Sequence, residues 1–478
     1  MTVSPSVLVW FRRDLRLADQ PALRAAAKTG LPVIPVYLHT SEDGSPSRPG
    51  AASRLWLHQS LLRLDVSLQA KRSRLVVRRG PAADTLPLLA AETNAQAVFL
   101  NRVLEPAALR EEQELESGLR SRGIRFECFH GGLLFEPGSI RTTTGGSFQV
   151  FTPFWRACWN ERARLRLPEK APATLSSPEC WPQSLPISDL RLEPETDWAA
   201  GIRAEWTPGE EAARDRLRAF ARHGVSQYGE QRDRTDREGT SRLSPHLHFG
   251  EVSPVQVWHA TAAHPEAEPF LRQLAWREFA WHLLGERPDT LTQPFNPQFR
   301  HFPWHPNTKW LKAWQRGRTG YPFVDAGMRQ LWATGWMHNR ARLVVASFLV
   351  KHLLIPWQEG AAWFLDTLVD ADLANNTMGW QWVAGCGVDA APYFRIFNPV
   401  LQGEKFDPAG EYVRRWIPEL RGLGPEWIHK PWNAPPLPLA AAGIRLGETY
   451  PRPLVDHATA RLLALAALEE MHRAARRG

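Results

Sequence analysis

The stretch Val7-Leu8-Val9-Trp10-Phe11-Arg12-Arg13-Asp14-Leu15-Arg16 decides the fold, because five apolar residues are followed at once by charged ones. An apolar run of this length is typical of a buried strand, and the charges after it would lie at the strand's carboxyl end. The run is too short for the core of a signal peptide and far too short to span a membrane. We therefore predict a buried strand at 7–11 and expect a soluble, cytoplasmic protein.

Further strand-like runs alternate with helical stretches over the first 130 residues. This alternation predicts a doubly wound parallel sheet, in which ligands bind at the carboxyl ends of the strands. No G-x-G-x-x-G follows the first strand, which disfavours a dinucleotide site of the Rossmann type. The predicted strands are 7–11, 32–38, 74–79, 97–102 and 125–130, and the predicted helices are 21–28, 51–69, 82–91 and 106–122.

The rest of the chain changes character twice. Residues 133–200 are rich in proline and show little periodicity, which predicts a long interdomain linker. From about residue 201 apolar positions recur at three- and four-residue spacing, as in helices. The fold class is therefore α/β followed by all-α: an α/β domain at 1–132, a linker at 133–200 and an all-helical domain at 201–478. The predicted helices of that domain are 210–223, 255–263, 269–284, 324–334, 340–354 and 361–368.

Composition excludes some classes of protein. In 478 residues, 43% hydrophobic and 23% charged residues exclude wholesale disorder. Four cysteines without a C-x-x-C pair argue against a disulfide scaffold and a zinc ribbon. The 50 arginines against eight lysines favour phosphate recognition without deciding it. The 22 tryptophans are the sharper anomaly, since tryptophan is not a common residue.

The segment 370–382, DADLANNTMGWQW, concentrates polar and aromatic residues. Ala374 stands where a calcium-binding EF-hand loop needs a ligand, so we expect no metal here. Trp380 and Trp382 are two residues apart and cannot face the same way on a helix. Either both pack in the core, or one faces the interior and the other a cavity or a partner.

Seven motifs of the chain resemble those of the cryptochrome/photolyase family, most like class I cyclobutane pyrimidine dimer photolyases. The resemblance covers about residues 7–470. The motifs are WFRRDLR at 10–16, EGTSRLS at 238–244, WREF at 276–279, GWMHNR at 335–340, N-x-x-x-GWQW at 375–382, DAAPYFRIFNP at 389–399 and QGEKFD at 402–407.

The resemblance implies FAD bound in the helical domain. Tyr228 and the segment 240–244 would hold its phosphates, with a plain helix N-cap as the alternative for Thr240 and Ser241. Asp372 would accept a hydrogen bond from the flavin ring N–H, and Asn376 would be the neutral polar neighbour of flavin N5. The Arg342–Asp370 pair would stabilise a reduced, anionic flavin. The implied cofactor-binding residues are Tyr228, Thr240, Ser241, Arg242, Leu243, Ser244, Phe270, Arg342, Asp370, Asp372 and Asn376.

The resemblance also implies an electron relay and a lesion site. Trp380, Trp357 and Trp304 match the family's electron-transfer triad. Trp276 and Trp382 resemble the pair that stacks on a flipped-out dimer. The implied catalytic residues are Trp276, Trp382, Gln273, Asn339 and Asn376, and the implied DNA-binding residues are Arg232, Trp276, Asn339, Arg340, Arg395 and Gln402.

Three departures from the dimer-photolyase pattern bear on the lesion. Gln273 stands where dimer photolyases usually carry Glu; an amide still hydrogen-bonds but supplies no charge, and (6-4) photolyases share it. The two histidines that (6-4) enzymes use for acid catalysis are replaced by Asn339 and Leu343. His338 is adjacent but is expected to face elsewhere. Leu343 also replaces a common Met, which conserves volume.

The predicted function is light-driven repair of cyclobutane pyrimidine dimers in DNA by a deoxyribodipyrimidine photo-lyase, through electron transfer from excited reduced FAD to a flipped-out dimer. The alternatives are a cryptochrome-like blue-light receptor and (6-4) photoproduct repair. Arg12, Asp14 and Glu105 lie where the family holds a second, antenna chromophore; folate, deazaflavin and FMN remain open. The expected partner is UV-damaged DNA. We expect no association with a membrane and no bound metal, and we expect the protein to be a monomer.

Overall fold

The computed structural model describes residues 4–40, 49–389 and 394–476. The chain forms two compact units, each described by itself below. Unit 1 comprises residues 1–226 and 241–286, and unit 2 comprises residues 227–240 and 287–478. The segment 227–240 therefore packs with the C-terminal part of the chain although unit 1 surrounds it in sequence.

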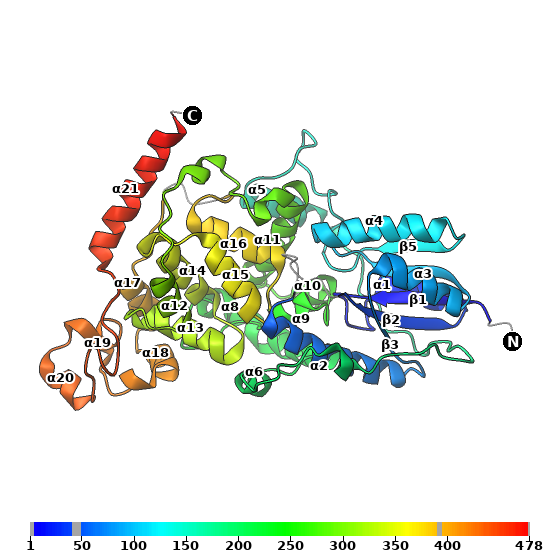
Figure 1. Cartoon of the computed structure of the whole chain (residues 1–478), viewed down its shortest axis with the longest axis horizontal. Helices are drawn as coiled ribbons and strands as arrows, with labels where there is room; N and C mark the ends of the chain where they lie inside the picture. The colour runs from blue at the N-terminus through cyan, green and yellow to red at the C-terminus, as the bar shows by residue number, and fades with distance from the viewer. Residues whose placement is uncertain (1–3, 41–48, 390–393, 477–478) are drawn as a thin grey trace. The chain divides into compact units, whose positions relative to one another are not determined.

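Unit 1 begins with a parallel sheet of five strands in the order β3-β2-β1-β4-β5 (Figure 1). This confirms the doubly wound sheet predicted from the first 130 residues. The order reverses at β1, so the carboxyl ends of β1 and β4 border the crevice where such sheets bind ligands. The strands are β1 (Ser6–Phe11), β2 (Val33–His39), β3 (Val76–Arg79), β4 (Ala95–Asn101) and β5 (Arg125–Phe129).

Helices cover the sheet because its inner strands β1 and β2 are apolar and buried on both faces. α1 (Pro21–Lys28), α3 (Ala82–Glu92) and α4 (Pro106–Arg120) contact β4 or β5, and α1 and α2 (Ala51–Gln69) have the predicted bounds. The other helices of unit 1 are α5 (Phe151–Glu161), α6 (Ala200–Glu205), α7 (Glu210–Ala219), α9 (Ser244–His248), α10 (Pro254–Thr261) and α11 (Glu268–Glu286), with α8 (Val225–Gln231) at the boundary between the units.

The proline-rich stretch 133–200 is less irregular than the sequence indicates. It contains α5 and two 3-10 turns, Arg162–Arg164 and Ile187–Leu190. Its backbone also bonds to the sheet region: the Val33 amide donates to the Ser176 carbonyl at 2.8 Å, and the Leu185 amide donates to the Val77 carbonyl at 3.0 Å. The stretch is thus held along β2 and β3 by backbone hydrogen bonds.

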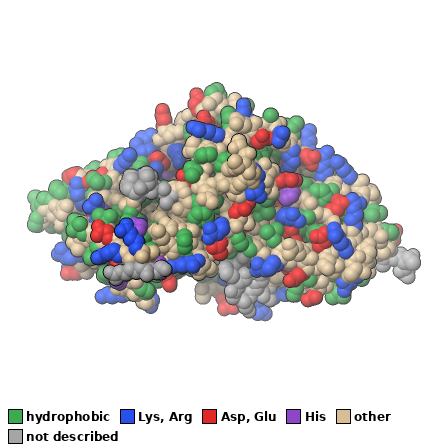
Figure 2. Space-filling model, turned by 90° about the horizontal axis from the view of Figure 1, so that it is seen from above, with side chains coloured by type: hydrophobic (Ala, Val, Ile, Leu, Met, Phe, Trp, Pro, Cys, Tyr) green, Lys and Arg blue, Asp and Glu red, His purple; other side chains and the backbone are tan. Residues whose placement is uncertain are grey.

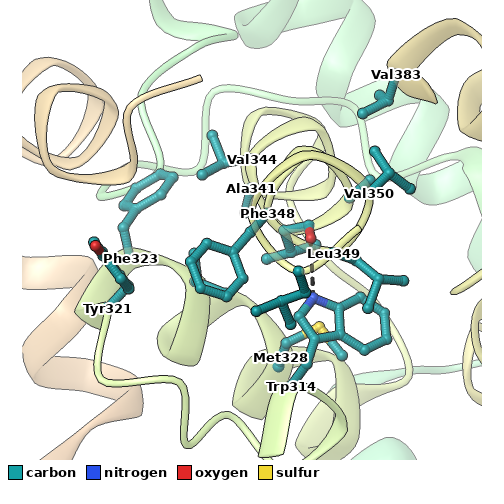
Figure 3. Packing of buried hydrophobic residues seen from close by; sticks show 14 of the residues in the cluster. Trp314, Tyr321, Phe323, Met328, Ala341, Val344, Phe348, Leu349, Val350 and Val383 are labelled. Carbon is teal, nitrogen blue, oxygen red and sulfur yellow. Dashed lines mark hydrogen bonds between the residues drawn. The ribbon is translucent and has the colours of Figure 1, made fainter. Parts of the chain in front are cut away.

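Unit 2 is built of helices around a large apolar core. Trp314 is fully buried there, and its indole nitrogen donates to the Val345 carbonyl at 2.9 Å (Figure 3). The α-helices are α12 (Thr308–Gln315), α13 (Pro322–Thr334), α14 (Asn339–Ser347), α15 (Trp357–Thr367), α16 (Leu373–Ala384), α17 (Pro399–Phe406), α18 (Glu411–Trp416), α19 (Pro425–Ile428), α20 (Pro436–Ala441) and α21 (His457–Ala475). Short 3-10 turns lie at Pro288–Leu291, Pro297–His301, Pro418–Leu420 and Pro431–Asn433.

Two helices predicted as continuous change their winding before they end. The helix predicted at 340–354 is α14 followed by a π-helical turn, Phe348–His352. The helix predicted at 210–223 is α7 followed by a second such turn, Phe220–Gly224. Apolar periodicity does not report the extra residue that a π turn inserts. Among the described residues, no helix is long and apolar enough to cross a membrane.

Candidate functional site

A buried ion pair lies at one end of α16 in unit 2. Arg342 Nη2 is 3.0 and 2.8 Å from the two carboxylate oxygens of Asp370, whose side chain is only 3% exposed. Arg342 Nε donates to the Met337 carbonyl at 2.8 Å, which fixes the guanidinium. A carboxylate buried this deeply is tolerated because it is paired and hydrogen-bonded. The structure therefore brings together the pair predicted from the sequence.

The first turn of α16 places polar side chains beside this pair. Asp372 is the N-cap residue, and its Oδ1 accepts from the Asn375 amide at 2.9 Å and from Asn375 Nδ2 at 2.7 Å. Asn376 Nδ2 donates to the Ala361 carbonyl at 3.1 Å, which orients its amide. Gly379 lies three residues further on the same helix face, and a Cβ there would meet nothing within 4 Å. This face of α16 therefore has open space beside its amide groups.

These residues fit a flavin. An isoalloxazine ring presents hydrogen-bond donors and acceptors on a flat apolar body, and needs an acceptor, a neutral polar neighbour and a nearby cation when it is reduced. Asp372, Asn376 and Arg342 supply these groups, and Gly379 leaves room beside them. Among the described residues, no group of three or more His, Cys, Asp or Glu could hold a metal ion.

Trp380 lies in the core behind that face. It is 2% exposed, and its ring packs edge-on against Phe364 and Trp314 at centroid distances of 5.0 and 6.2 Å. Its indole N–H has no hydrogen-bond partner in the described part of the chain. The ring lies so close to α15 that a Cβ on Gly360 would be 2.1 Å from Cη2. Sequence reasoning missed Gly360, because a glycine inside a predicted helix indicates lower helix stability and does not show which side chain packs against it.

The other tryptophans predicted for the site have different surroundings. Trp357 is 2% exposed and begins α15, whereas Trp304 is half-buried against Phe302 at a centroid distance of 4.4 Å. Trp382 is half-buried, and its Nε1 donates to the Asp389 carbonyl at 2.9 Å. Trp380 is thus buried while Trp382 is partly accessible, as their spacing on a helix predicts. Residues 390–393 of the motif at 389–399 lie outside the described residues.

Two predicted DNA-binding arginines of unit 2 share one carboxylate. Arg340 Nη2 is 2.7 Å from Asp233 Oδ2, and Arg232 Nε is 3.8 Å from Asp233 Oδ1. The Arg340 guanidinium lies 4.4 Å from the Phe406 ring centroid, and that of Arg232 lies 5.5 Å from the Tyr228 ring centroid. Of the remaining predicted contacts in unit 2, Asn339 and Arg395 are exposed and Gln402 is half-buried. Sequence reasoning gave no role to Asp233.

His338 faces the helix that follows it. It is the N-cap residue of α14, 3% exposed, and its Nδ1 accepts from the Arg340 amide at 3.1 Å. Burial lowers the pKa of His338 to about 4, so the ring is neutral at pH 7. The expectation that His338 faces away from the lesion site stays a prediction.

The predicted lesion residues of unit 1 lie on α11. The ring of Trp276 stacks on Phe151 at a centroid distance of 3.7 Å and an interplanar angle of 7°. Gln273 Nε2 donates to the Pro269 carbonyl one turn earlier at 3.1 Å. Phe270 is 4% exposed and packs against Phe220 at 4.6 Å in the interior of unit 1.

The predicted phosphate-binding segment is distributed over both units. Tyr228 and Thr240 belong to unit 2, and residues 241–244 belong to unit 1. Arg242 has a left-handed backbone (φ 52°), pairs with Glu205 and stacks over Trp206 at 4.4 Å. Leu243 is 1% exposed.

The start of α9 excludes the alternative that Thr240 or Ser241 is a helix N-cap. α9 begins at Ser244 with Leu243 as its N-cap residue, so neither Thr240 nor Ser241 caps a helix. That reading was wrong because the backbone turns once more before the helix starts: Ser241 Oγ accepts from the Leu243 amide at 3.4 Å, a local turn that serine favours.

Charged residues after β1 form a network at the carboxyl ends of the strands. Asp14 is 5% exposed and accepts from Gln20 Nε2 and Asn101 Nδ2, both at 2.7 Å. Arg12 Nη2 donates to Glu112 Oε1 at 2.7 Å. Glu105 pairs with Arg13 at 2.7 Å. Burial raises the pKa of Asp14 despite these bonds. Each of the three residues expected near an antenna chromophore therefore already has a polar partner within unit 1.

Two family models match the chain. Residues 7–174 match the model described as DNA photolyase, and residues 270–470 match the model described as the FAD binding domain of DNA photolyase. The second match contains Arg342, Asp370, Asp372 and Asn376, and also the three tryptophans predicted as a relay.

Curated relatives cover nearly the whole chain. A deoxyribodipyrimidine photo-lyase of Agrobacterium fabrum is 48% identical over 96% of this chain and 97% of its own length. Cryptochrome-1 of Arabidopsis thaliana is 39% identical over 95% of this chain and 69% of its own length.

Solved structures agree with these relatives. A bacterial class III photolyase from Agrobacterium tumefaciens has a TM-score of 0.95 at 47% identity, covering 99% of both chains. An archaeal photolyase from Sulfolobus tokodaii with two FAD molecules has a TM-score of 0.82 at 29% identity, covering 97% of this chain and 99% of its own. The motifs resembled class I enzymes, whereas this comparison favours class III. The chain belongs to the DNA photolyase/cryptochrome family and carries that family's FAD-binding domain.

Proposed function

We propose that this protein repairs cyclobutane pyrimidine dimers in DNA under blue light. The observation that carries the proposal is the polar row of Arg342, Asp370, Asp372 and Asn376 in front of the buried Trp380, inside the matched FAD-binding domain. The near-full-length similarity to enzymes named deoxyribodipyrimidine photo-lyase supports it. A reduced FAD held there supplies, on absorbing light, the electron that splits the dimer.

The residues around the flavin hold it and tune it. Asp372 would accept a hydrogen bond from the flavin ring, and Asn376 would offer a neutral amide. Arg342, held in place by Asp370, would lower the energy of a negative flavin through a short electrostatic interaction in a partly desolvated site. Trp380 would donate an electron to oxidised flavin, and Trp357 and Trp304 would relay the resulting hole.

The lesion residues capture and position the dimer. The ring of Trp276, held rigid by Phe151, offers a flat surface on which a flipped-out base stacks, and Trp382 offers a second. Gln273 hydrogen-bonds the exposed base edge through its amide. Asn339, Arg340, Arg232, Arg395 and Gln402 hold the DNA backbone around the lesion, so binding weakens as salt rises.

Two further readings have specific support. Cryptochrome relatives match nearly the whole chain, which favours a blue-light receptor as the second candidate. Gln273 favours (6-4) repair, but His338, which precedes Asn339 in the sequence, is buried and neutral, so it offers no acid for that chemistry. We also propose an antenna chromophore at the strand ends, the three-part division at residues 132 and 200, a monomeric state and a cytoplasmic location.

The decisive experiment is repair of an oligonucleotide that carries one thymine dimer. Reduced protein is illuminated with blue light beside a dark control and a (6-4) substrate. We expect reversal of the thymine dimer in the light only. Activity on the (6-4) substrate alone would contradict dimer repair. Photoreducible FAD without repair of either lesion would favour the receptor.

The relay is tested separately by Trp380→Phe. We expect the variant to lose photoreduction of oxidised FAD while it keeps repair after chemical reduction, because repair itself needs no electron from the relay. Photoreduction at the wild-type rate in Trp380→Phe would contradict the role given to Trp380.

A further inference from the structure

One carboxylate holds two arginines that the proposed function assigns to DNA. Asp233 follows α8 in a turn, and its two oxygens point to different guanidinium groups, Arg340 at 2.7 Å and Arg232 at 3.8 Å. The Asp233 side chain is 40% exposed, and those of Arg340 and Arg232 are 20% and 26% exposed. The cluster, which we call the Asp233 clamp (Arg232, Asp233 and Arg340), is thus open to solvent.

Many arginines of this protein have an acidic neighbour, and on the face shown in Figure 2 basic and acidic side chains are interspersed. In the Asp233 clamp two guanidinium groups share one carboxylate, and each also lies over an aromatic ring, Arg340 over Phe406 and Arg232 over Tyr228. Cation–π contact on one side and a shared anion on the other restrict where the two cations can point. A single anion is therefore held between two oriented arginines.

The position of that anion suits a phosphate. Arg340 is the second residue of α14, and the positive end of a helix favours negative charge. A carboxylate and a DNA phosphate both present two oxygens to the fork of a guanidinium. When a phosphate approaches, it competes with Asp233 for the same donors and is also repelled by the Asp233 charge.

We infer that Asp233 is an internal substitute for a DNA phosphate: it keeps Arg232 and Arg340 oriented in the free protein and competes with DNA for them. The inference rests on the proposed function, because DNA is the anion that displaces Asp233. By this competition Asp233 weakens the hold of the protein on DNA backbone and so limits its retention on undamaged duplex.

The test compares Asp233→Asn with the wild-type protein in DNA-binding titrations over a range of salt concentrations. The probes are an undamaged duplex and the same duplex with one thymine dimer. An exposed ion pair is worth little, so we expect Kd for undamaged duplex to fall about two- to fivefold at low salt. The plot of log affinity against log salt should steepen by about one, because an additional arginine becomes available to phosphate.

The matched control is Glu448→Gln, which also removes one exposed carboxylate paired with an arginine of unit 2, Arg445 at 3.1 Å. It changes net charge equally, so any general electrostatic gain appears in both variants. Asp233→Glu should bind undamaged duplex as weakly as the wild-type protein, because it keeps a carboxylate at this position. Melting temperatures of all variants report whether the fold is kept.

Three results would overturn the inference: an effect of Asp233→Asn no larger than that of Glu448→Gln, an unchanged salt slope, or weaker binding of both duplexes. The last would mean that Asp233 only orients the arginines. These outcomes are distinguishable from failure of the proposed function, which would appear as absence of lesion binding and repair in the wild-type protein.

Discussion

At position 360 the side chain of Trp380 occupies the space in which any other residue would place its Cβ. A Cβ there would lie 2.1, 2.5 and 2.6 Å from three ring carbons of Trp380, and the ring cannot retreat because Phe364 and Trp314 pack against it. Gly360 therefore sets how closely α15 approaches the proposed electron donor. The close approach of the two helices therefore depends on the absence of a side chain at this one residue.

We predict that Gly360→Ala displaces Trp380 and slows photoreduction of bound oxidised FAD, while repair by chemically reduced protein is affected less. Overpacking of this kind also costs about 1–3 kcal/mol of stability. Transient absorption of the flavin measures the first effect and thermal unfolding the second. The control is Gly285→Ala in α11, where a Cβ would meet nothing within 4 Å, so the better helix former should be neutral or stabilising. Photoreduction at the wild-type rate in Gly360→Ala would show that Trp380 tolerates the displacement.

At the scale of an element, α11 anchors a loop through one buried acid. Glu278 is 4% exposed and accepts from the Leu134 and Phe135 amides at 2.9 and 3.3 Å. Burial raises the pKa of Glu278 from 4.5 to about 7, although Arg277 and the two amides oppose the rise. A neutral carboxyl group is thus favoured in the folded protein over a wide pH range.

The raised pKa makes stability depend on pH with a definite sign. Between pH 4.5 and about 7 the folded protein binds a proton at Glu278 that the unfolded chain has lost, so this stabilising contribution is present below pH 4.5 and lost as pH rises through 7. The full difference is about 3 kcal/mol. We predict that the melting temperature of the wild-type protein falls relative to that of Glu278→Gln between pH 5 and 8, by several degrees. A constant difference across this range would show that Glu278 is charged throughout.

The same scale shows what the sequence could and could not predict. The ends of α1 and α2 were predictable, because Pro21 starts one helix and apolar spacing marks the other. α5 was hidden in a proline-rich stretch, and α16 was treated as a motif although Asp372 is a regular N-cap. The Arg342–Asp370 pair came from family motifs. Gly360 and Asp233 could not have come from them, since a close approach between α15 and α16 and a carboxylate shared by distant arginines exist only in three dimensions.

At the scale of the whole molecule, FAD binding should stabilise unit 2 more than unit 1. The FAD-binding match covers 270–470, most of which lies in unit 2, and so do Arg342, Asp370, Asp372 and Asn376. A ligand that binds only the folded state stabilises it by about 2.7 kcal/mol at one hundred times its Kd. In a unit of this size that corresponds to a rise of roughly 5–10 °C in melting temperature.

We predict that removing FAD lowers the melting temperature of unit 2 more than that of unit 1, because unit 1 contributes only the segment 241–244 and α11 to the proposed cofactor residues. Differential scanning calorimetry of apoprotein and FAD-loaded protein measures this, with limited proteolysis and mass spectrometry assigning each transition to a unit. Arg342→Met combined with Asp370→Asn provides the control, since it removes the cation without leaving a buried carboxylate unpaired, and it should reduce the shift caused by FAD. An equal shift in both transitions would mean that the units unfold together when the cofactor leaves, and no shift in either would contradict the cofactor site on α16.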